Sequence, residues 1–384
     1  MVITKTGECI SVSDLVRIAP GALVVGKPLP WTVYDLSGNV LLRQGHVIHS
    51  ESQLEQLFER ALFYPRKPVA AEPEQVEEIR VYNPFEEYPG LLQALEAVLT
   101  AISDHESDAP QRLTALARLI DDVCLSAPDP SLALVHLYAV EPTAYEQTLF
   151  YAIICHFIAR ALGLEEQRVL VLLGAALTAN LALLPFLDKL NRSSRRLTDQ
   201  QRQVIRKHPL LSAKALREAG IKNRQLLTII EQHHEHHDGT GYPAGLTSEN
   251  ILPEAQILAL AERYTAMITR RAYRDRLTVS DAMKAIRKAA IDSPRPGISS
   301  ALLSALTPYP PGCLARLANF EVAVVTHRPF RNTGPTAQAI IGPKGDLYSG
   351  AFKRDCSLLE FSIRMVEDVD VLPSMDFGLL WEFE

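Results

Sequence analysis

The feature that most constrains the fold is a helical period of apolar residues that runs from about residue 90 to residue 305. Leu91, Leu95 and Val98, for example, recur at spacings of four and three residues, which places them on one face of a helix. No alternating strand pattern interrupts this stretch. The middle of the chain, residues 90–305, is therefore predicted to be an all-α domain.

The sequence before this domain has a different pattern. Residues 31–42 alternate apolar and polar side chains around Ser37-Gly38-Asn39, which is typical of a hairpin, and Ser50 precedes a short helical period. Prolines and glutamates follow, and each proline disfavours helix at the residue before it. We therefore expect a small β-rich N-terminal domain in residues 1–66 and a linker in residues 67–89.

Strand-like patterns return after the helical stretch. Residues 320–325, 336–341 and 359–363 are β-like and are separated by turn sequences such as Pro343-Lys344-Gly345-Asp346. We expect a β extension in residues 306–384. The predicted fold class is mainly α, with a helical domain flanked by a small N-terminal β-rich domain and a C-terminal β appendage.

Composition excludes some classes of partner and location. The net charge of −6 provides no broad cationic surface, so no nucleic-acid partner is expected. The five cysteines are scattered without CxxC spacing, and the N-terminus lacks a secretory signal, which together suit the cytoplasm. The most apolar stretch, residues 169–187, is interrupted by Thr178, Asn180 and Pro185. We interpret it as a buried core helix and not as a membrane span.

The most informative stretch is residues 231–246, which reads Glu-Gln-His-His-Glu-His-His-Asp-Gly-Thr-Gly-Tyr-Pro-Ala-Gly-Leu. Imidazoles are the commonest nitrogen ligands of transition metals, and a helix that ends in a glycine-rich turn can hold them rigidly. The alternative is a solvated polar helix end. For His236 and His237 that alternative is the better interpretation.

The whole stretch resembles the HD-GYP signature HHExxDGxGYP at every fixed position. Upstream, His208-Pro209 resembles the His-Pro element of that family. Downstream, residues 257–267 resemble the helix that supplies a metal-binding aspartate, and Arg271 follows where the family has an Arg-Pro-Tyr element. The chain is thus identified as an HD-GYP domain protein of the HD superfamily, similar to cyclic di-GMP phosphodiesterases.

The resemblance implies a bacterial signalling protein that acts on cyclic di-GMP with two or three metal ions, often iron or manganese. In such a site a metal-activated hydroxide attacks phosphorus while the metals neutralise the phosphate oxygens. The Gly241-Tyr242-Pro243 loop is associated in the family with docking to GGDEF-domain proteins. Helical domains of this kind often pair, which is compatible with a homodimer, although the sequence does not determine the oligomeric state.

Several positions depart from the family pattern. Aligning the helix that should carry the His-Asp dyad places Ala179 on the histidine, Asn180 on the aspartate and Leu183 on the lysine. Gln147 falls on a further family histidine, whereas His156 is interpreted as a core residue. A bridging carboxylate is therefore missing, and no confident catalytic residue remains at the dyad.

The surviving ligand candidates are His208, His233, His234 and Glu262, and the last of these stands where the family has aspartate. This set suits one divalent transition metal, such as iron or manganese, or none. Arg271 is expected either to meet a phosphate or to form a surface salt bridge.

Three functions stay open from the sequence. The first is a non-catalytic regulator that binds cyclic di-GMP or a GGDEF protein, because the GYP half of the signature is intact and the dyad is degenerate. The second is a metal-dependent cyclic di-GMP phosphodiesterase or phosphohydrolase with a reduced metal site. The third is a scaffold whose terminal β domains make the contacts, with Trp31 either as a recognition aromatic or as packing.

Overall fold

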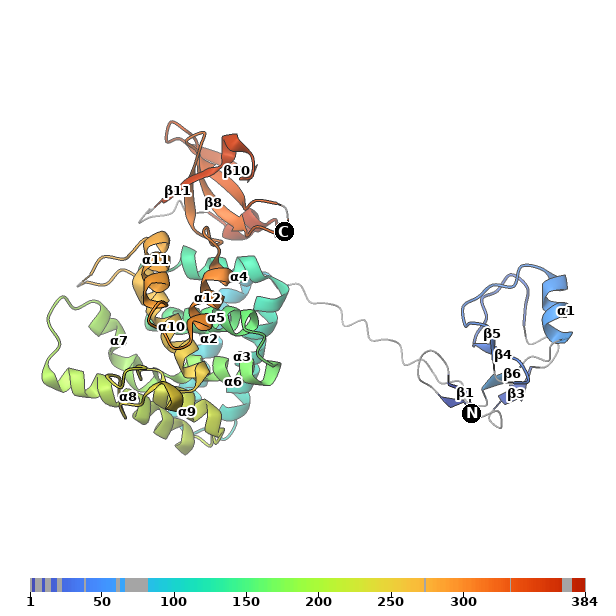
Figure 1. Ribbon diagram of the computed structural model, residues 1–384, viewed down its shortest axis with the longest axis horizontal. Helices are drawn as coiled ribbons and strands as arrows, with labels where there is room; N and C mark the ends of the chain where they lie inside the picture. The colour runs from blue at the N-terminus through green and yellow to red at the C-terminus, as the bar shows by residue number, and fades with distance from the viewer. Residues whose placement is uncertain are drawn as a thin grey trace. The chain divides into compact units, whose positions relative to one another are not determined.

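The computed structural model describes residues 2–3, 9–10, 15–18, 23–37, 39–59, 63–65, 82–272, 274–331, 333–367 and 375–383. They belong to two compact units, Met1–Arg80 and Val81–Glu384. Figure 1 shows the elements of both units.

The first unit is a small β structure, as predicted. Its strands are β1 (Val2–Ile3), β2 (Cys9–Ile10), β3 (Leu15–Arg17), β4 (Val33–Tyr34), β5 (Val40–Leu42) and β6 (Phe63–Pro65), and its helix is α1 (Glu51–Glu59). Strands β1 and β2 pair, and the other four form a sheet of order β3-β6-β4-β5. The predicted hairpin is the β4–β5 pair, whose turn is held by Asp35 Oδ1 accepting the backbone N–H of Ser37 and Asn39. Trp31 packs against the small core of this unit, which supports its interpretation as packing.

The second unit is mainly helical. Its helices are α2 (Pro84–Ser103), α3 (Ala109–Ser126), α4 (Pro128–Leu137), α5 (Ala144–Ala161), α6 (Glu166–Thr178), α7 (Leu184–Asn191), α8 (Asp199–Glu218), α9 (Arg224–Gln232), α10 (Pro253–Ile268), α11 (Val279–Ala289) and α12 (Pro296–Leu306). Short 3₁₀ turns, η2 (Leu181–Leu183) and η3 (Ser248–Asn250), lie between α6 and α7 and before α10. A capping box formed by Thr198 and Gln201 starts α8, since each side chain bonds the other residue's backbone N–H.

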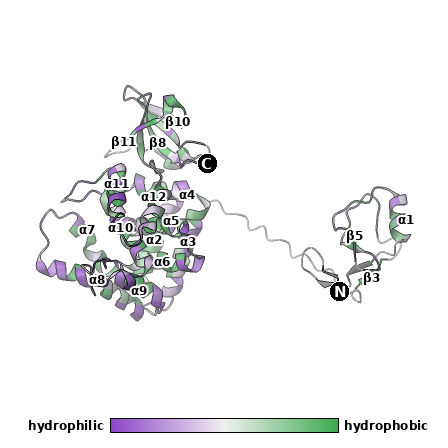
Figure 2. Ribbon diagram, viewed as in Figure 1, coloured by the Kyte–Doolittle hydropathy of each residue, from purple (hydrophilic) through white to green (hydrophobic). Residues whose placement is uncertain are grey.

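Helices α5 and α6 form the centre of the helical core. They pack against each other, and most residues of both are buried. Figure 2 shows their hydrophobic residues in green inside the bundle, with hydrophilic residues in purple on α8 and α9. The stretch Glu166–Asn191 is long and apolar enough to cross a membrane, but its most apolar window is 78% buried within the protein. That burial agrees with the interpretation as a core helix.

The helical domain begins earlier than predicted. Helix α2 starts at Pro84, so the last residues of the expected 67–89 linker are helical. Asn83 caps the helix by accepting the N–H of Phe85, and Pro84 occupies the first helical turn, where its missing N–H costs nothing. The sequence prediction gave too much weight to the prolines. Residues 67–81 lie outside the described residues.

The C-terminal extension is a five-stranded antiparallel sheet of order β10-β9-β8-β7-β11. Its strands are β7 (Leu314–Leu317), β8 (Val322–His327), β9 (Thr336–Ile341), β10 (Leu347–Asp355) and β11 (Ile363–Glu367), and a 3₁₀ turn, η5 (Phe377–Trp381), follows. The predictions at 320–325 and 336–341 correspond to β8 and β9. The prediction at 359–363 was wrong for its first residues, because Leu359–Phe361 form a 3₁₀ turn, η4, in which Leu359 is 90% exposed.

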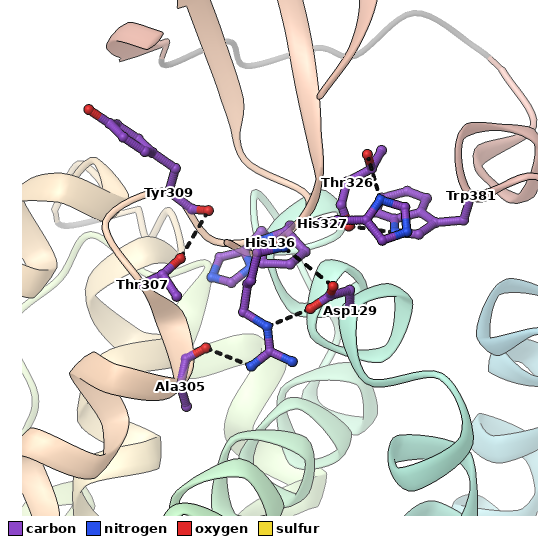
Figure 3. Close-up of polar contacts among 10 residues, drawn as sticks. Asp129, His136, Ala305, Thr307, Tyr309, Thr326, His327 and Trp381 are labelled. Atoms are coloured by element: carbon purple, nitrogen blue, oxygen red, sulfur yellow. Dashed lines mark hydrogen bonds and ion pairs between the residues drawn. The ribbon is translucent and has the colours of Figure 1, made fainter. Parts of the chain in front are cut away.

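This sheet shares a hydrophobic core with helix α4, so it is part of the second unit and not a separate appendage. Ala133 and Leu137 of α4 cluster with residues of β7, β8 and β9 and with Trp381. Figure 3 shows this junction, where Trp381 Nε1 donates to the Thr326 carbonyl oxygen at 2.7 Å. Gly312 lies so close to α4 that a Cβ atom there would be 2.6 Å from the Ala133 carbonyl oxygen.

Polar contacts also join the sheet to the helices. Arg328 Nε donates to Asp129 Oδ1 at 2.5 Å, and its Nη1 donates to the Ala305 carbonyl oxygen at 2.9 Å. Both side chains of the ion pair are more than three-quarters buried. Charged groups in such surroundings require partners, so this pair fixes how the sheet meets α4 and α12.

A buried histidine connects the same junction to helix α10. His136 Nδ1 donates to the Pro311 carbonyl oxygen at 2.8 Å, which leaves Nε2 as the acceptor of the Tyr264 hydroxyl at 2.7 Å. Burial lowers the pKa of His136 to about 4. The imidazole is therefore neutral at pH 7, and a carbonyl at the start of the sheet determines its tautomer.

The lowered pKa of His136 predicts that the stability of the fold depends on pH. Above about pH 6.5 His136 is neutral in both states, but between about pH 6.5 and pH 4 only the unfolded chain binds the proton. The free energy of unfolding should therefore fall on acidification, by about 1.4 kcal/mol per pH unit from this residue. Urea unfolding of the wild type and of His136→Asn at pH 7.0, 6.0 and 5.0 checks this. The wild type should lose more stability than the variant, and parallel losses would contradict the prediction.

Candidate metal centre

The predicted ligand residues converge from three separate parts of the helical unit, and Asn180 joins them from a fourth. His208 lies on α8, His233 and His234 directly follow α9, and Glu262 lies on α10. Asn180 lies at the turn between α6 and η2. Figure 1 shows helices α8, α9 and α10 next to one another. The residues are up to 82 positions apart in sequence, so only the packing of these helices brings them together.

The backbone fixes the tautomers of two of the histidines. His208 Nδ1 donates to the Ile205 carbonyl oxygen, and His233 Nδ1 donates to the Ile230 carbonyl oxygen, each at 2.6 Å. A carbonyl can only accept, so Nδ1 carries the hydrogen in both rings. The two Nε2 atoms face each other at 3.3 Å. In the neutral rings both atoms present lone pairs, which repel unless a cation lies between them.

Burial keeps these rings neutral. It lowers the pKa of His208 to about 3 and that of His233 to about 4, and the charge of His233 lowers the pKa of His208 further. The pKa of His234 is also well below its usual value, first because of burial and then because of His233 and His208. Neutral imidazoles with inward-facing Nε2 atoms are the form that binds a metal ion.

The geometry of the cluster fits one metal ion. Ligand atoms of His208, His233 and His234 all lie within 4.8 Å of one another. Two imidazole nitrogens bound to one metal at about 2.0–2.1 Å are roughly 3.0–3.4 Å apart, which matches the 3.3 Å between His208 and His233. Glu262 Oε2 is 3.9 Å from Nε2 of both His233 and His234, so this carboxylate is placed to complete the set.

Glu262 is a buried carboxylate with a raised pKa of about 7. Burial is the main cause, and the Asn180 hydrogen bond and the charge of Arg271 act in the opposite direction. Asn180 Nδ2 donates to Glu262 Oε1 at 2.5 Å. Asn180 therefore contacts the carboxylate through its nitrogen, which cannot bind a metal ion.

The other positions at which the alignment predicts a change, Ala179, Leu183 and Gln147, are all buried. Ala179 is fully buried in the main helical core, and Leu183, which is 4% exposed, forms part of the wall of the neighbouring cavity. Gln147 is buried, with its amide nitrogen on the Pro142 carbonyl oxygen and its amide oxygen accepting the Tyr151 hydroxyl. His156 is a core histidine, as predicted, and its Nδ1 bonds Asp121 at 2.8 Å.

The Gly-Tyr-Pro loop folds back over the histidines. A Cβ atom on Gly241 would lie 2.3 Å from the backbone nitrogen of His236, so only glycine fits there. Glu235 anchors the loop by accepting the backbone N–H groups of Ala244, Gly245 and Leu246 at 2.6–3.1 Å. The Tyr242 ring stacks on His234 with centroids 4.8 Å apart, and it precedes a cis peptide bond to the partly buried Pro243.

A cavity of about 830 Å³ opens beside the metal centre. Its lining includes the three histidines, Glu262, Tyr242 and Arg271, together with other cationic side chains, Arg195, Arg196, Arg263 and Arg295. Helix α10 and the segment between α7 and α8 contribute several of these. A cavity of this volume is large enough for a small-molecule ligand, and its arginines favour an anionic one.

Sequence reasoning missed three roles in this site. It treated Asn180 as a lost ligand, whereas the amide is the hydrogen-bond partner of Glu262. It assigned no role to Glu235, and it predicted no contact between Tyr242 and the histidines. The tight turn at Asp238-Gly239, which returns the chain toward α9, was the available signal for an inward-facing tyrosine.

Comparison with known proteins agrees with this site. The family model described as "HD domain" matches residues 133–293, which contain all four candidate ligands. The cyclic di-GMP phosphodiesterase PdeB of Borreliella burgdorferi is 33% identical over 123 residues, 32% of each chain. The response regulator RpfG of Xanthomonas campestris, also a cyclic di-GMP phosphodiesterase, is 32% identical over 129 residues, 33% of this chain and 34% of its own.

A cyclic di-GMP phosphodiesterase of Pseudomonas aeruginosa matches a longer stretch, with 27% identity over 219 residues, 56% of this chain and 52% of its own. The chain thus spans between a third and about half of the length of these relatives. The family model, the relatives and the histidine cluster all indicate the same kind of domain. Residues 133–293 form an HD domain related to those of the HD-GYP cyclic di-GMP phosphodiesterases.

Proposed function

We propose that this protein is a receptor of bacterial cyclic di-GMP signalling that binds the dinucleotide with the help of one metal ion and does not hydrolyse it at the rate of a phosphodiesterase. The observation that carries the proposal is the composition of the metal centre. Three imidazoles and one carboxylate converge on a single point, and the position of a bridging carboxylate is taken by Asn180.

The cavity supports cyclic di-GMP as the ligand. Its volume of about 830 Å³ lies within the usual range of ligand pockets, and its arginines complement two phosphodiester groups. Apolar side chains such as Leu187 and Ile298 line other parts of it and suit the faces of the bases. The three relatives are named as phosphodiesterases of this dinucleotide.

The same centre argues against fast hydrolysis. In-line attack on a phosphodiester is fastest when cations neutralise both the attacking and the leaving oxygen, as two-metal sites do. Among the described residues, the only group of three or more histidine, cysteine or acidic side chains spaced for a metal is the triad His208, His233 and His234. Ala179 and Leu183 offer no polar atom at the dyad.

The second candidate is a phosphodiesterase with a reduced site, favoured by the neutral imidazoles and by Arg271 in the same cavity. A bound divalent metal would supply Lewis acidity toward a phosphate oxygen and toward water. His208 and His233 would hold it through Nε2, Glu262 would offset its charge, and Arg271 would meet the phosphate.

Two further proposals concern the surroundings of the site. The Gly241-Tyr242-Pro243 loop would dock a GGDEF-domain protein, and because Tyr242 stacks on His234, such docking would act directly on the metal centre. The protein would work in the cytoplasm, where its cysteines stay reduced.

Binding and turnover measured on one sample test the proposal. Titration of the Mn²⁺-loaded full-length chain with cyclic di-GMP should give saturable binding with one site per chain, and product analysis should show little linear dinucleotide after many hours. Arg271→Ala should weaken binding by about 10-fold or more, since a phosphate contact of a guanidinium contributes about 1.5–3 kcal/mol. Arg287→Ala, on α11, is the matched control and should bind as the wild type does.

Multiple turnover that is lost in His233→Ala would favour the phosphodiesterase instead. The absence of any cyclic di-GMP binding would reject both candidates.

A further inference from the structure

Glu262 has two carboxylate oxygens with different surroundings. Oε1 accepts Asn180 Nδ2 at 2.5 Å, while Oε2 lies 3.9 Å from Nε2 of both His233 and His234. The Asn180 side chain is 7% exposed and follows the C-terminus of α6, which is buried throughout its second half. Its amide is thus held by a rigid element, and it holds the carboxylate in turn.

The different contacts of Oε1 and Oε2 depend on the residue types at both position 180 and position 262. An aspartate at 262 would place its carboxylate roughly 1.5 Å closer to the α10 backbone, beyond hydrogen-bond range of Asn180 in this arrangement. An aspartate at 180 would bring a carboxylate oxygen to about the 2.5 Å now spanned by the amide nitrogen. Two anionic oxygens at that separation need a proton or a cation between them.

We propose that Asn180 is a positioning residue that turns Glu262 Oε2 toward His233 and His234, and that the Asn180–Glu262 pair limits this centre to one metal ion. The inference rests on the metal-binding part of the proposed function. The neutral amide offers no anionic ligand to a second cation, and its hydrogen bond occupies one acceptor site of Glu262 Oε1. The centre is therefore built for a single ion and is not an incomplete two-metal site.

The opposite interpretation is that Asn180 is only packing that replaced a lost ligand. Packing alone does not explain a donor aimed at the one carboxylate of the centre. Side chains that orient a metal ligand typically change metal affinity by 10- to 100-fold when removed. A residue that only packs would change the stability of the apo protein and leave metal affinity and stoichiometry as they were.

The test is equilibrium dialysis of the full-length chain against Mn²⁺, with metal counted by elemental analysis. The wild type should bind one Mn²⁺ per chain. Asn180→Ala should bind it at least 10-fold more weakly, because Glu262 is no longer oriented. Asn180→Asp, which is nearly isosteric, should raise the stoichiometry to two, because the paired carboxylates then hold a second ion.

Asn191→Asp is the matched control. It adds a carboxylate to the same cavity from α7, and it should bind one Mn²⁺ with the wild-type affinity. Circular dichroism of each variant establishes that it is folded, and Asn180→Asp keeps the test valid if the alanine variant does not fold. Wild-type affinity in Asn180→Ala, one Mn²⁺ in Asn180→Asp, or two or none in the wild type would each overturn the inference.

Titration of the same wild-type sample with cyclic di-GMP separates this inference from the receptor proposal. If the protein binds one Mn²⁺ but no cyclic di-GMP, the receptor proposal is rejected, while the proposed role of the Asn180–Glu262 pair is still supported. If it binds cyclic di-GMP but no Mn²⁺, the proposed role of the pair is rejected, while the protein is still a cyclic di-GMP receptor.

Discussion

His233→Ala is expected to weaken Mn²⁺ binding by on the order of 100-fold or more. His233 is fully buried, its Nε2 faces that of His208 at 3.3 Å, and its ring is the nearest neighbour of His234. Loss of an outer-shell partner already costs 10- to 100-fold in metal affinity, so loss of a direct ligand should cost at least the upper end. Isothermal titration of the apo protein with Mn²⁺ measures the change.

The control for this variant is His237→Ala. His237 is an exposed histidine four residues farther along, outside the cluster of three. It should bind Mn²⁺ as the wild type does, which would confirm that position in the fold, and not histidine content, determines affinity. Full Mn²⁺ binding by a folded His233→Ala protein would place the metal elsewhere and would remove the basis of the proposed function.

Trp381→Ala is expected to lower the free energy of unfolding of the helical unit by about 3–5 kcal/mol, the usual cost of deleting a large buried aromatic side chain. Trp381 is 7% exposed, packs on Phe85 with ring centroids 5.0 Å apart, and donates to the Thr326 carbonyl oxygen. The change therefore leaves a cavity and an unpaired carbonyl at the junction of the sheet with α2 and α4. Urea unfolding followed by circular dichroism at 222 nm reports on the helices.

Leu379→Ala is the comparison for this stability measurement. Leu379 lies in the same 3₁₀ turn but is 63% exposed, so its removal should change the stability by no more than about 0.5 kcal/mol. Equal stability of Trp381→Ala and wild type would mean that the sheet and the helices unfold independently. The predicted loss of stability in Trp381→Ala would instead show that the helical domain requires the sheet. A fragment of residues 90–305 would then be less stable than the whole chain.

The junction also bears on the metal centre. The Pro311 carbonyl oxygen, His136 and the Tyr264 hydroxyl form a continuous line of hydrogen bonds from the sheet to α10. Tyr264 is two residues from Glu262 and is fully buried. The sheet therefore helps to fix the helix that places Glu262 near His233 and His234.

Local patterns in the sequence predicted the main elements well. The helical period of 90–305, the hairpin at 31–42 and the capping box at Thr198 depend on neighbouring residues, so the sequence alone was sufficient for them. Predictions failed where a residue type has two uses. Pro84 was taken as a mark of a linker but starts α2, because proline suits the first helical turn as well as an extended chain.

The candidate ligands were also accessible from the sequence, since His208, His233, His234 and Glu262 were chosen from the family resemblance. Their convergence on one point was not accessible, because it depends on the packing of α9 and α10 against α6 and of α8 against α9 and η2. The same holds for the burial that lowers the pKa of His208 and His233 and raises that of Glu262.

The sequence by itself determined the family resemblance and the mainly helical class, and it predicted a departure from the family pattern at Ala179 and Asn180. Only the tertiary structure decided which contacts Asn180 makes. The sequence lists Asn180 and Glu262 as two separate departures from a pattern, 82 positions apart. Folding brings them to hydrogen-bonding distance, and a neutral amide beside a buried carboxylate is stable where two carboxylates would repel. Asn180 and Glu262, which both depart from the family pattern, thereby form one hydrogen-bonded pair.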